Sequence, residues 1–313
     1  MQLVMRCDDF GYTPVFNLGL KKVLEEGICT HVELMSDTPG NIDAMETMRK
    51  YPWVSVGWHQ HFRGKPVLAP DEVPTLVNEK GQFKFRDVWS KDTFNAEAKK
   101  KKFDGVDYNE MVKELRAELA LFEKHMGRVP DVAGGRPGNV AGDATIQVCE
   151  EYGIAYQCTR SVRPDGSVSD VLDKWKHVKM VTVNQPSHPV YLVRINEDSY
   201  IRNCTYDPLS YILNDEQHIL DLECGCMAWH PGYYDDYMFD DATYFYNGDR
   251  RFFEPSPLVD CQMLCDPRLR QWIKDNKIEL ISTADAVYGT KKFQNHLRSI
   301  DSDLYIGNIL AGK

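Results

Sequence analysis

The N-terminal part of the chain alternates short apolar runs with amphipathic segments, and this alternation is compatible with few folds. Apolar runs cover residues 3–5, 32–35 and 54–58, while residues 15–26 and 42–49 between them carry apolar side chains at helical spacing. The order strand, helix, strand, helix, strand is typical of a parallel sheet or barrel, because each parallel connection needs a crossover. We therefore predict an α/β fold with a mostly parallel sheet.

The rest of the chain continues these elements around one long irregular segment. Residues 108–126 form the clearest predicted helix, with apolar side chains at steps of three and four. Further predicted strands are residues 129–133, 179–183, 190–195, 226–229 and 279–282, and further predicted helices are 143–152, capped by Asp143, and 267–276. Residues 63–105 are rich in Pro, Gly, Lys and Asp, which favours an inserted lid or binding loop, with a disordered insertion as the alternative. No repeat or shift in composition marks a boundary, so residues 1–313 are predicted to form one domain.

Charge and composition argue against several classes of partner. A net charge of −10 at pH 7 does not suit nucleic acid or an anionic membrane surface, which attract basic patches. We find no apolar run long enough for a membrane span and no signal-peptide core at the N-terminus. The nine cysteines are scattered, which predicts reduced thiols in a cytoplasmic protein. A structural zinc at Cys224 and Cys226 or at Cys261 and Cys265 is an alternative, although the paired CxxC spacing is missing.

Polar side chains stand where several of the predicted strands end. Asp8 and Asp9 follow the first apolar run, His59 and His61 follow the third, and His230 follows a late one. The carboxyl ends of parallel strands meet at one edge of the sheet, where the sites of α/β proteins are built. Two adjacent carboxylates repel each other, so this doublet needs a cation, hydrogen-bond donors or water nearby. A solvated turn is the alternative interpretation.

His59 and His61 are two residues apart, a spacing that directs both imidazoles to the same side of an extended chain. Together with a carboxylate they would suit zinc, manganese, cobalt or nickel, whereas a single histidine is more often a core or surface residue. A metal held in this way lowers the pKa of bound water toward about 7. A second carboxylate would then act as general base, and a histidine from another strand would protonate the leaving group. This set of residues predicts hydrolysis of an amide or an ester.

Several longer motifs, spread over nearly the whole chain, are shared with one known family. They are CDDFG at 7–11 with Asn17, VGWH at 56–59, GKPV at 64–67, PTLVNEKGQF at 74–83, MAWHPGYYD at 227–235 and DPRLRQWIKDNKIELIS at 266–282. On these motifs the chain resembles the YdjC-like carbohydrate deacetylases, which include chitooligosaccharide deacetylases. The resemblance implies a distorted (β/α) barrel that removes an N-acetyl group from an amino sugar with the help of a bound divalent metal.

The resemblance also implies roles for individual residues. Asp9 matches the metal-binding carboxylate of the family and His59 a metal-binding imidazole. Asp8 matches the catalytic base, and His230 is the histidine of the family's HPG motif. The family's His-rich segment, which completes the metal site, is replaced here by PDVAGGRPGNV at residues 130–140, which contains no histidine.

Without that histidine, the third metal ligand has to come from elsewhere, and His61 is the candidate. Arg136 lies in the replaced segment and is predicted to contact the substrate or its carbonyl oxygen. Trp58 and Tyr233 are aromatic residues near predicted strand ends that would stack on a sugar ring, with ordinary packing as the alternative.

Three functions are compatible with these features. The first is a metal-dependent deacetylase of a small N-acetylated sugar or oligosaccharide, with zinc as the first choice of metal and magnesium, manganese, cobalt or nickel as alternatives. The second is a barrel hydrolase with a different substrate, its pocket reshaped by the GGRPGN segment. The third is a sugar-binding or regulatory protein that has lost catalysis. The expected partner is a small carbohydrate, with no nucleic acid or membrane, and formation of a homo-oligomer is left open.

Overall fold

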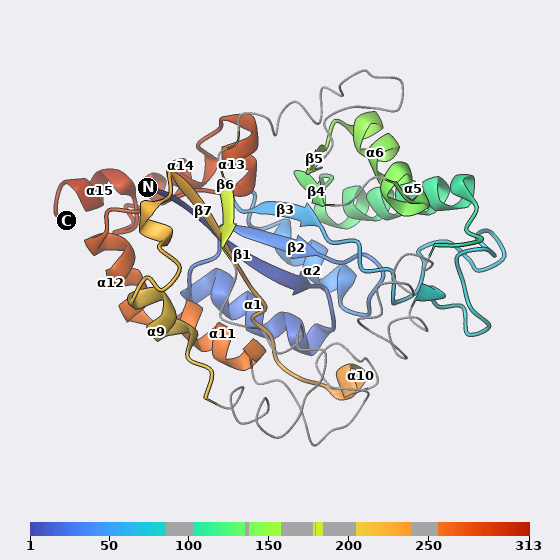
Figure 1. The fold of residues 1–313 in the computed structure, drawn as a ribbon, viewed down its shortest axis with the longest axis horizontal. Coiled ribbons are helices and arrows are strands. Elements are labelled where there is room, and N and C mark those ends of the chain that lie inside the picture. Colours follow the sequence, from blue (N-terminus) through green and yellow to red (C-terminus); the bar gives the residue numbers. More distant parts are fainter. Residues whose placement is uncertain (86–102, 135–137, 158–177, 179, 184–204, 240–255) are drawn as a thin grey trace.

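The structure is a computed structural model that describes residues 1–85, 103–134, 138–157, 178, 180–183, 205–239 and 256–313. Its strands are β1 (Gln2–Phe10), β2 (His31–Leu34), β3 (Ser55–Trp58), β4 (Val132–Gly134), β5 (Ala155–Gln157), β6 (Met180–Val183), β7 (Cys224–Trp229) and β8 (Glu279–Leu280). They form one sheet in the order β5-β4-β3-β2-β1-β7-β6, with β8 paired to the start of β1, and these strands pair in parallel. The sheet curls into a half-barrel surrounded by helices, which confirms the predicted α/β fold and distorted barrel (Figure 1).

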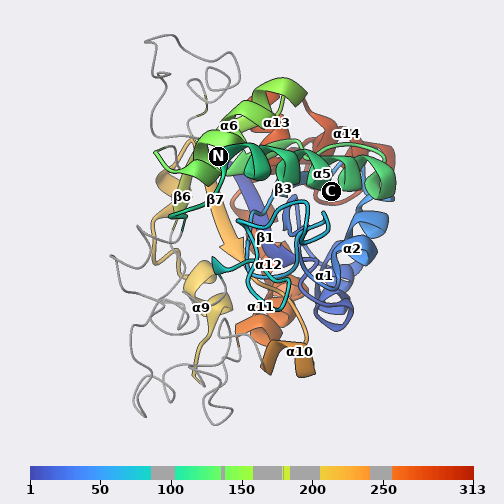
Figure 2. The same ribbon diagram turned by 90° about the vertical axis from the view of Figure 1, so that its right-hand side faces the viewer.

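Helices cover the outside of the curled sheet. They are α1 (Pro14–Glu26), α2 (Asn41–Met48), α5 (Tyr108–Met126), α6 (Val140–Tyr152), α9 (Pro208–Leu213), α10 (Asp236–Phe239), α11 (Ser256–Leu264), α12 (Pro267–Asp275), α13 (Thr283–Tyr288), α14 (Lys292–Ser299) and α15 (Ile306–Leu310), with a short 3₁₀ helix at Ile219–Asp221. Figure 2 shows the edge at which the strands end, with α5 and α6 on one side of the sheet and α1 and α2 on another. This edge carries the polar residues that the sequence places after the strands.

The end of the long helix α5 and the start of α6 show how the local sequence determines where a helix begins and ends. α5 coincides with the helix predicted from apolar spacing, and it ends at Gly127 in the left-handed conformation (φ 82°) that glycine adopts readily. The predicted cap of α6, Asp143, is wrong. Asn139 caps this helix by accepting a hydrogen bond from the Gly142 amide (3.0 Å). Asp143 lies in the first turn, where it accepts from the Gly138 amide (3.0 Å).

The described part of the inserted segment is anchored to the core by aromatic side chains. Phe62, Phe83, Phe85 and Phe103 are buried, and their ring centroids lie between 4.6 and 6.2 Å apart in the contacting pairs. Four of these pairs are edge-to-face and Phe83 stacks on Phe85; both kinds of contact add stabilisation to that of the area that the rings bury. Residues 86–102 of the segment lie outside the described residues, as does the strand predicted at residues 190–195.

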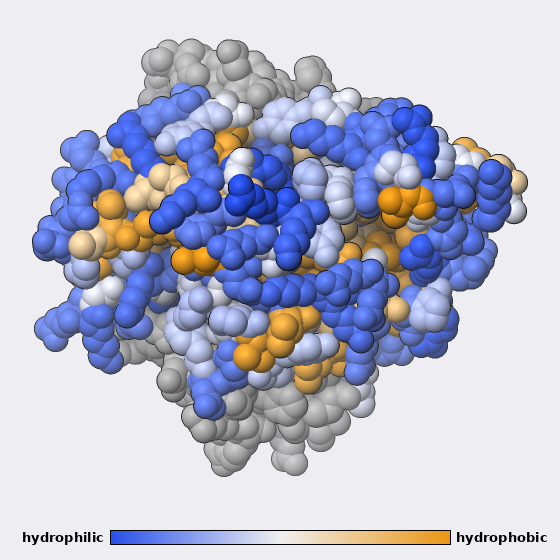
Figure 3. Space-filling view, turned by 180° about the vertical axis from the view of Figure 1, so that it is seen from behind, coloured by the Kyte–Doolittle hydropathy of each residue, from blue (hydrophilic) through white to orange (hydrophobic). Residues whose placement is uncertain are grey.

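The hydropathy of the surface and the state of the cysteines can be compared with what the composition predicts. The face opposite to that of Figure 1 is mainly hydrophilic, with small separate hydrophobic areas (Figure 3). None of the described helices combines the length and the hydrophobicity that a membrane span requires. The seven cysteines that the structure describes are free thiols, and within the described ranges no cluster of His, Cys, Asp or Glu forms a structural zinc site.

Two buried glutamates lie on the inner face of α5. Glu118 accepts hydrogen bonds from Trp58 Nε1 (2.8 Å) and Ser36 Oγ (2.6 Å). Burial, followed by the charge of Glu114, raises the pKa of Glu118 well above its usual range, because donors to the carboxylate compensate only part of the desolvation. Burial likewise raises the pKa of Glu114 from 4.5 to about 7.

The folded state therefore binds protons more tightly at these two carboxyls than the unfolded chain does. The resulting stabilisation is complete below the unfolded pKa of about 4.3 and is lost as the pH rises through about 7 and above. Glu118→Gln is expected to remove on the order of 1–3 kcal/mol of this pH dependence between pH 6 and pH 8.5, measured by urea unfolding. Glu123→Gln, at an exposed position of the same helix, serves as control and should keep the wild-type slope. A wild-type slope in Glu118→Gln would contradict the assignment.

Candidate active site

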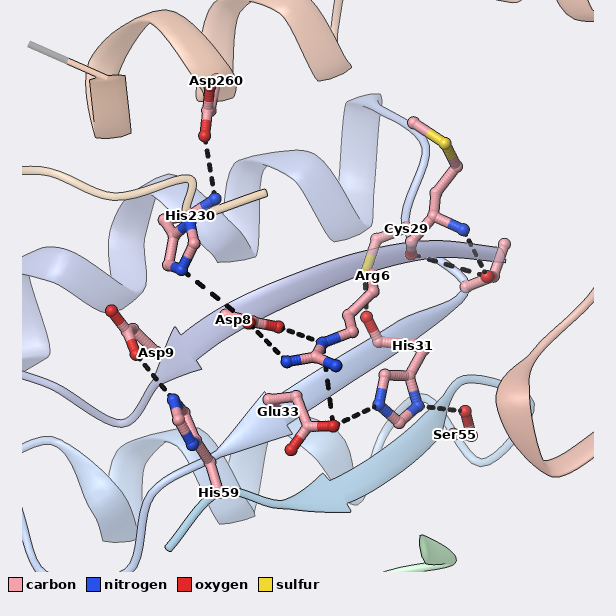
Figure 4. Close-up of polar contacts among 12 residues, drawn as sticks. Arg6, Asp8, Asp9, Cys29, His31, Glu33, Ser55, His59, His230 and Asp260 are labelled. Carbon is pink, nitrogen blue, oxygen red and sulfur yellow. Dashed lines mark hydrogen bonds and ion pairs between the residues drawn. The ribbon is translucent and has the colours of Figure 1, made fainter. Parts of the chain in front are cut away.

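Strand β1 is distorted at the point where its two carboxylates lie. Its pairing with β2 shifts between Cys7 and Phe10, and within this irregularity Asp9 adopts a positive φ of 63°. A left-handed conformation costs a non-glycine residue on the order of 1–3 kcal/mol, and such strain clusters at functional sites, as do bulges. Figure 4 shows the result: Asp8 faces Arg6, whereas Asp9 faces a different strand end.

The turn after β1 is held by the residues of the CDDFG motif and its distant asparagine. Gly11 has a φ of 100°, and a Cβ added to it would lie 2.9 Å from the carbonyl oxygen of Met35. Its amide donates to Asn17 Oδ1 (2.8 Å), and its carbonyl accepts from Thr38 Oγ1 (2.6 Å). Only glycine meets both the conformational and the steric requirement, so the turn and the acidic doublet have fixed positions.

Asp9 pairs with the histidine that follows β3. His59 Nε2 lies 2.9 Å from Asp9 Oδ1; the Asp9 side chain is largely buried, whereas that of His59 is about one-third exposed. Burial by itself lowers the pKa of His59. The hydrogen bond to Asp9 and its charge, together with the charges of Asp8 and Glu33, outweigh this effect and raise the pKa to about 9. A metal ion would have to displace the proton that this pKa leaves on His59, after which the imidazole and the carboxylate are ligand types that zinc accepts.

Asp8 pairs with an arginine on its own strand and faces the histidine that follows β7. Arg6 donates to both of its oxygens, from Nε to Oδ1 (2.5 Å) and from Nη2 to Oδ2 (2.7 Å). His230 Nε2 lies 3.8 Å from Asp8 Oδ2, because the pairing of Cys7 with Trp229 brings the ends of β1 and β7 side by side. The backbone amide of His230 donates to Asp260 Oδ2 on α11 (2.9 Å), which fixes the histidine from the opposite side.

His61 lies in a separate polar cluster. Its Nδ1 is 3.2 Å from Asp37 Oδ2, an oxygen that also accepts from the amides of Arg63 and Gly64. β3 ends at Trp58, so His59 and His61 follow the strand and do not lie within it. Within the described ranges no group of three His, Cys, Asp or Glu residues is spaced to hold a metal. The role of His61 as third ligand stays a prediction.

The predicted sugar contacts have different outcomes. Trp58 is only 1% exposed and its indole donates to a buried glutamate, so it packs in the core and is out of reach of a sugar ring. Tyr233 is half-buried against the core, with its hydroxyl 3.9 Å from the thiol of Cys261, and its substrate contact stays a prediction. Arg136 lies outside the described residues.

Sequence reasoning missed three charged residues around the doublet: Arg6, Glu33 and Asp260. A signal for Arg6 exists, since it lies two residues before Asp8 and therefore on the same face of the strand. Glu33 is similarly placed in its strand, two residues after His31. Asp260 gives no such signal, because it reaches His230 from a helix that follows much later in the chain.

A half-open cavity of about 520 Å³ lies beside the same edge. It is lined by Ser36, Asp37, Thr38, Pro39, Asn41, Lys65, Pro66, Val67, Gln82, Leu121 and Tyr237. Two contacts connect it to the turn after β1: Thr38 bonds the Gly11 carbonyl, and Tyr237 packs edge-on against Tyr12, with centroids 6.1 Å apart. Apolar walls with a few polar groups are typical of small-molecule sites of this size.

Known proteins are similar to this chain in fold and in sequence. A carbohydrate deacetylase 2 from Listeria innocua is 25% identical over 295 residues, which cover 91% of this chain and 98% of the relative. A carbohydrate deacetylase from Enterococcus faecalis is 31% identical over 134 residues, which cover 42% of this chain and 46% of the relative. The crystal structure of an Enterococcus faecalis V583 protein, with a proposed role in cellobiose-phosphate cleavage, has a TM-score of 0.59 at 19% identity, covering 91% of this chain and 98% of that one. The model of the YdjC-like protein family matches residues 2–275, and the chain therefore belongs to this family.

Proposed function

We propose that this chain is an enzyme that removes the N-acetyl group from an amino sugar or a small oligosaccharide with the help of a divalent metal. The observation that carries the proposal is the division of the acidic doublet. Asp9 lies against His59 and Asp8 against Arg6 and His230, at the edge of the sheet beside an open cavity. The names of the Listeria and Enterococcus relatives support the reaction type.

Asp9 and His59 are the residues that would hold the metal, zinc first, with manganese, cobalt, nickel or magnesium as alternatives. Their direct contact of 2.9 Å brings together a carboxylate and an imidazole, the ligand types that zinc prefers. A metal bound there supplies polarisation of the acetyl carbonyl and a water of lowered pKa. His61, whose Nε2 has no hydrogen-bond partner among the described residues, is proposed as a further ligand.

The remaining polar groups account for the proton transfers of amide hydrolysis. Asp8 accepts a proton from the water whose oxygen attacks the acetyl carbon. His230 donates a proton to the sugar nitrogen as the carbon–nitrogen bond breaks, which yields acetate and a free amine. The distance of 3.8 Å between Asp8 Oδ2 and His230 Nε2 supports a role for both side chains at one reacting group.

The cavity beside the turn is proposed to take a ring of the carbohydrate. Tyr237 and Val67 offer apolar surface to the face of a sugar, and Lys65 and Gln82 offer hydrogen bonds to its substituents. The free thiols of the described residues suit a cytoplasmic enzyme.

The replaced segment at residues 130–140 favours a second candidate, a family member that binds sugar without hydrolysing it. A site with two rather than three protein ligands would bind metal more weakly. A barrel hydrolase with another substrate is the third candidate, with its pocket reshaped by the same segment.

Acetate release separates these candidates. Purified protein supplied with zinc is expected to release acetate from N-acetylglucosamine, its 6-phosphate or chitobiose, and to carry about one metal per chain by elemental analysis. Metal without acetate release from any of the three would favour another hydrolase substrate. Absence of both would overturn the proposal in favour of the sugar-binding protein.

Elemental analysis of single-residue variants tests the proposed metal ligands. His59→Ala is expected to lose the metal, and His61→Ala to lose it as well if His61 completes the site. His125→Ala serves as control, since that histidine lies on α5, away from the doublet. Full metal content in His61→Ala would exclude it as a ligand.

A further inference from the structure

A network of polar side chains, most of them buried, runs from Asp8 back into the sheet. Arg6 and Asp8 alternate with their neighbours on β1, so their side chains share one face of the strand. The guanidinium meets the carboxylate through two parallel hydrogen bonds of 2.5 and 2.7 Å. This two-point geometry fixes direction as well as distance, which one point charge cannot do.

Further residues of this polar network fix the position of Arg6. Glu33 Oε1 on β2 lies 3.8 Å from Arg6 Nε and 3.0 Å from His31 Nε2, and His31 Nδ1 lies 2.6 Å from Ser55 Oγ on β3 (Figure 4). Burial raises the pKa of Glu33, but the charge of Arg6 and the contact with His31 outweigh this effect and lower the pKa to about 2. Arg6 is therefore held between two carboxylates on neighbouring strands.

A glycine leaves the space that this arrangement needs. A Cβ added to Gly57 on β3 would lie 2.5 Å from the carboxyl carbon of Glu33. A side chain there would displace the glutamate and remove the second anchor of Arg6. The network thus depends on residues from three adjacent strands, β1, β2 and β3.

We propose that Arg6, anchored by Glu33, is a positioning residue that directs Asp8 toward His230 and separates it from Asp9. The inference rests on the proposed function, because it assigns Asp8 the role of base. Two adjacent carboxylates repel each other, and each has its own cationic or hydrogen-bonding partner here. Arg6 occupies both oxygens of Asp8, while Asp9 stays with His59 and remains available to a metal.

Kinetics test this role. Arg6→Met is expected to lower kcat for acetate release by about 10²-fold, because a misdirected base loses the reacting geometry, and to change KM by less than about threefold. Arg6→Lys restores the charge without the two-point geometry, and its kcat should lie between those of Arg6→Met and wild type. An unchanged kcat in Arg6→Met would overturn the proposal.

A matched ion pair elsewhere serves as control. Arg128 Nη1 lies 2.5 Å from Asp131 Oδ2, and the Arg128 side chain is 26% exposed, against 27% for Arg6. Arg128→Met should lose a similar amount of stability in urea without the fall in kcat. Equal losses of kcat in both methionine variants would show a structural role only, and would refute positioning.

A second measurement does not depend on activity. In crystal structures, wild type should show one rotamer of Asp8, and Arg6→Met should show a displaced or multiple carboxylate. If Arg6→Met does not fold, Glu33→Gln takes its place, and a loosened Arg6 with a displaced Asp8 is expected. An unmoved Asp8 carboxylate contradicts the inference. Failure of the proposed function would appear differently, as a wild type that releases no acetate.

Discussion

Asp8→Asn is expected to lower kcat for acetate release by about 10²–10⁴-fold, the range for loss of a general base. Asparagine keeps the shape of the side chain but cannot accept the proton of the attacking water. The metal content should stay at the wild-type level, since Asp9 and His59 are unchanged, and elemental analysis of the same samples checks this.

The control for this variant is Asp303→Asn. Asp303, in the turn between α14 and α15, also accepts hydrogen bonds from an arginine, Arg270 on α12, and its loss should leave kcat unchanged. An Asp8→Asn enzyme that retains more than about a tenth of the wild-type kcat would exclude Asp8 as the base.

Gly19→Ala is expected to have the second largest effect, although its position is helical. A Cβ at this position of α1 would lie 2.6 Å from the Cα of Gly232, a backbone atom that cannot rotate away. The segment of Gly232 and His230 has to move outward, which misplaces the proton donor. We expect kcat to fall by about 10²-fold and stability to fall by about 1–3 kcal/mol, against a gain of up to about 1 kcal/mol from the helix preference of alanine.

Steady-state kinetics and urea unfolding of Gly19→Ala measure both effects. Leu18→Ala, at the neighbouring position with half of its side chain exposed, should behave like wild type in activity. A Gly19→Ala variant that is more stable than wild type and fully active would show that α1 and the segment after β7 are not in tight contact.

Much of the site edge was predictable, because parallel strands bring their carboxyl ends together whatever their order. This rule correctly gathers the doublet of Asp8 and Asp9 with His59 and His230. It does not say which carboxylate meets which imidazole. That choice depends on the positive φ of Asp9 within an irregular stretch of β1. Aspartate tolerates this conformation better than most residues, but the doublet contains two aspartates, so residue type does not say which of them adopts it.

Strand spacing gave less information about His61 and Trp58 than we expected from the sequence. β3 ends at Trp58, so the side-chain alternation that pairs His59 with His61 no longer applies after it. The same strand is buried on both faces, so Trp58 has no exposed side for a ligand. The pattern of apolar residues did not distinguish a strand that is buried on one face from a strand that is buried on both faces.

The fold was most predictable where apolar spacing was long and regular, as in α5. Short elements gave little signal. The strand β5 has three residues, and α13 is a six-residue helix whose capping box, Ser282 with Asp285, is clear only once the boundary is known.

The central position of β1 affects how a nascent chain can mature. Gln2 is synthesised long before Cys224 and Glu279, the residues with which it pairs. Until then one edge of the strand has no backbone partner, and the emerging polypeptide is exposed to unwanted association. Productive folding therefore waits until β7 and β8 have been translated, and fragments that stop before β7 should depend on chaperones to stay in solution.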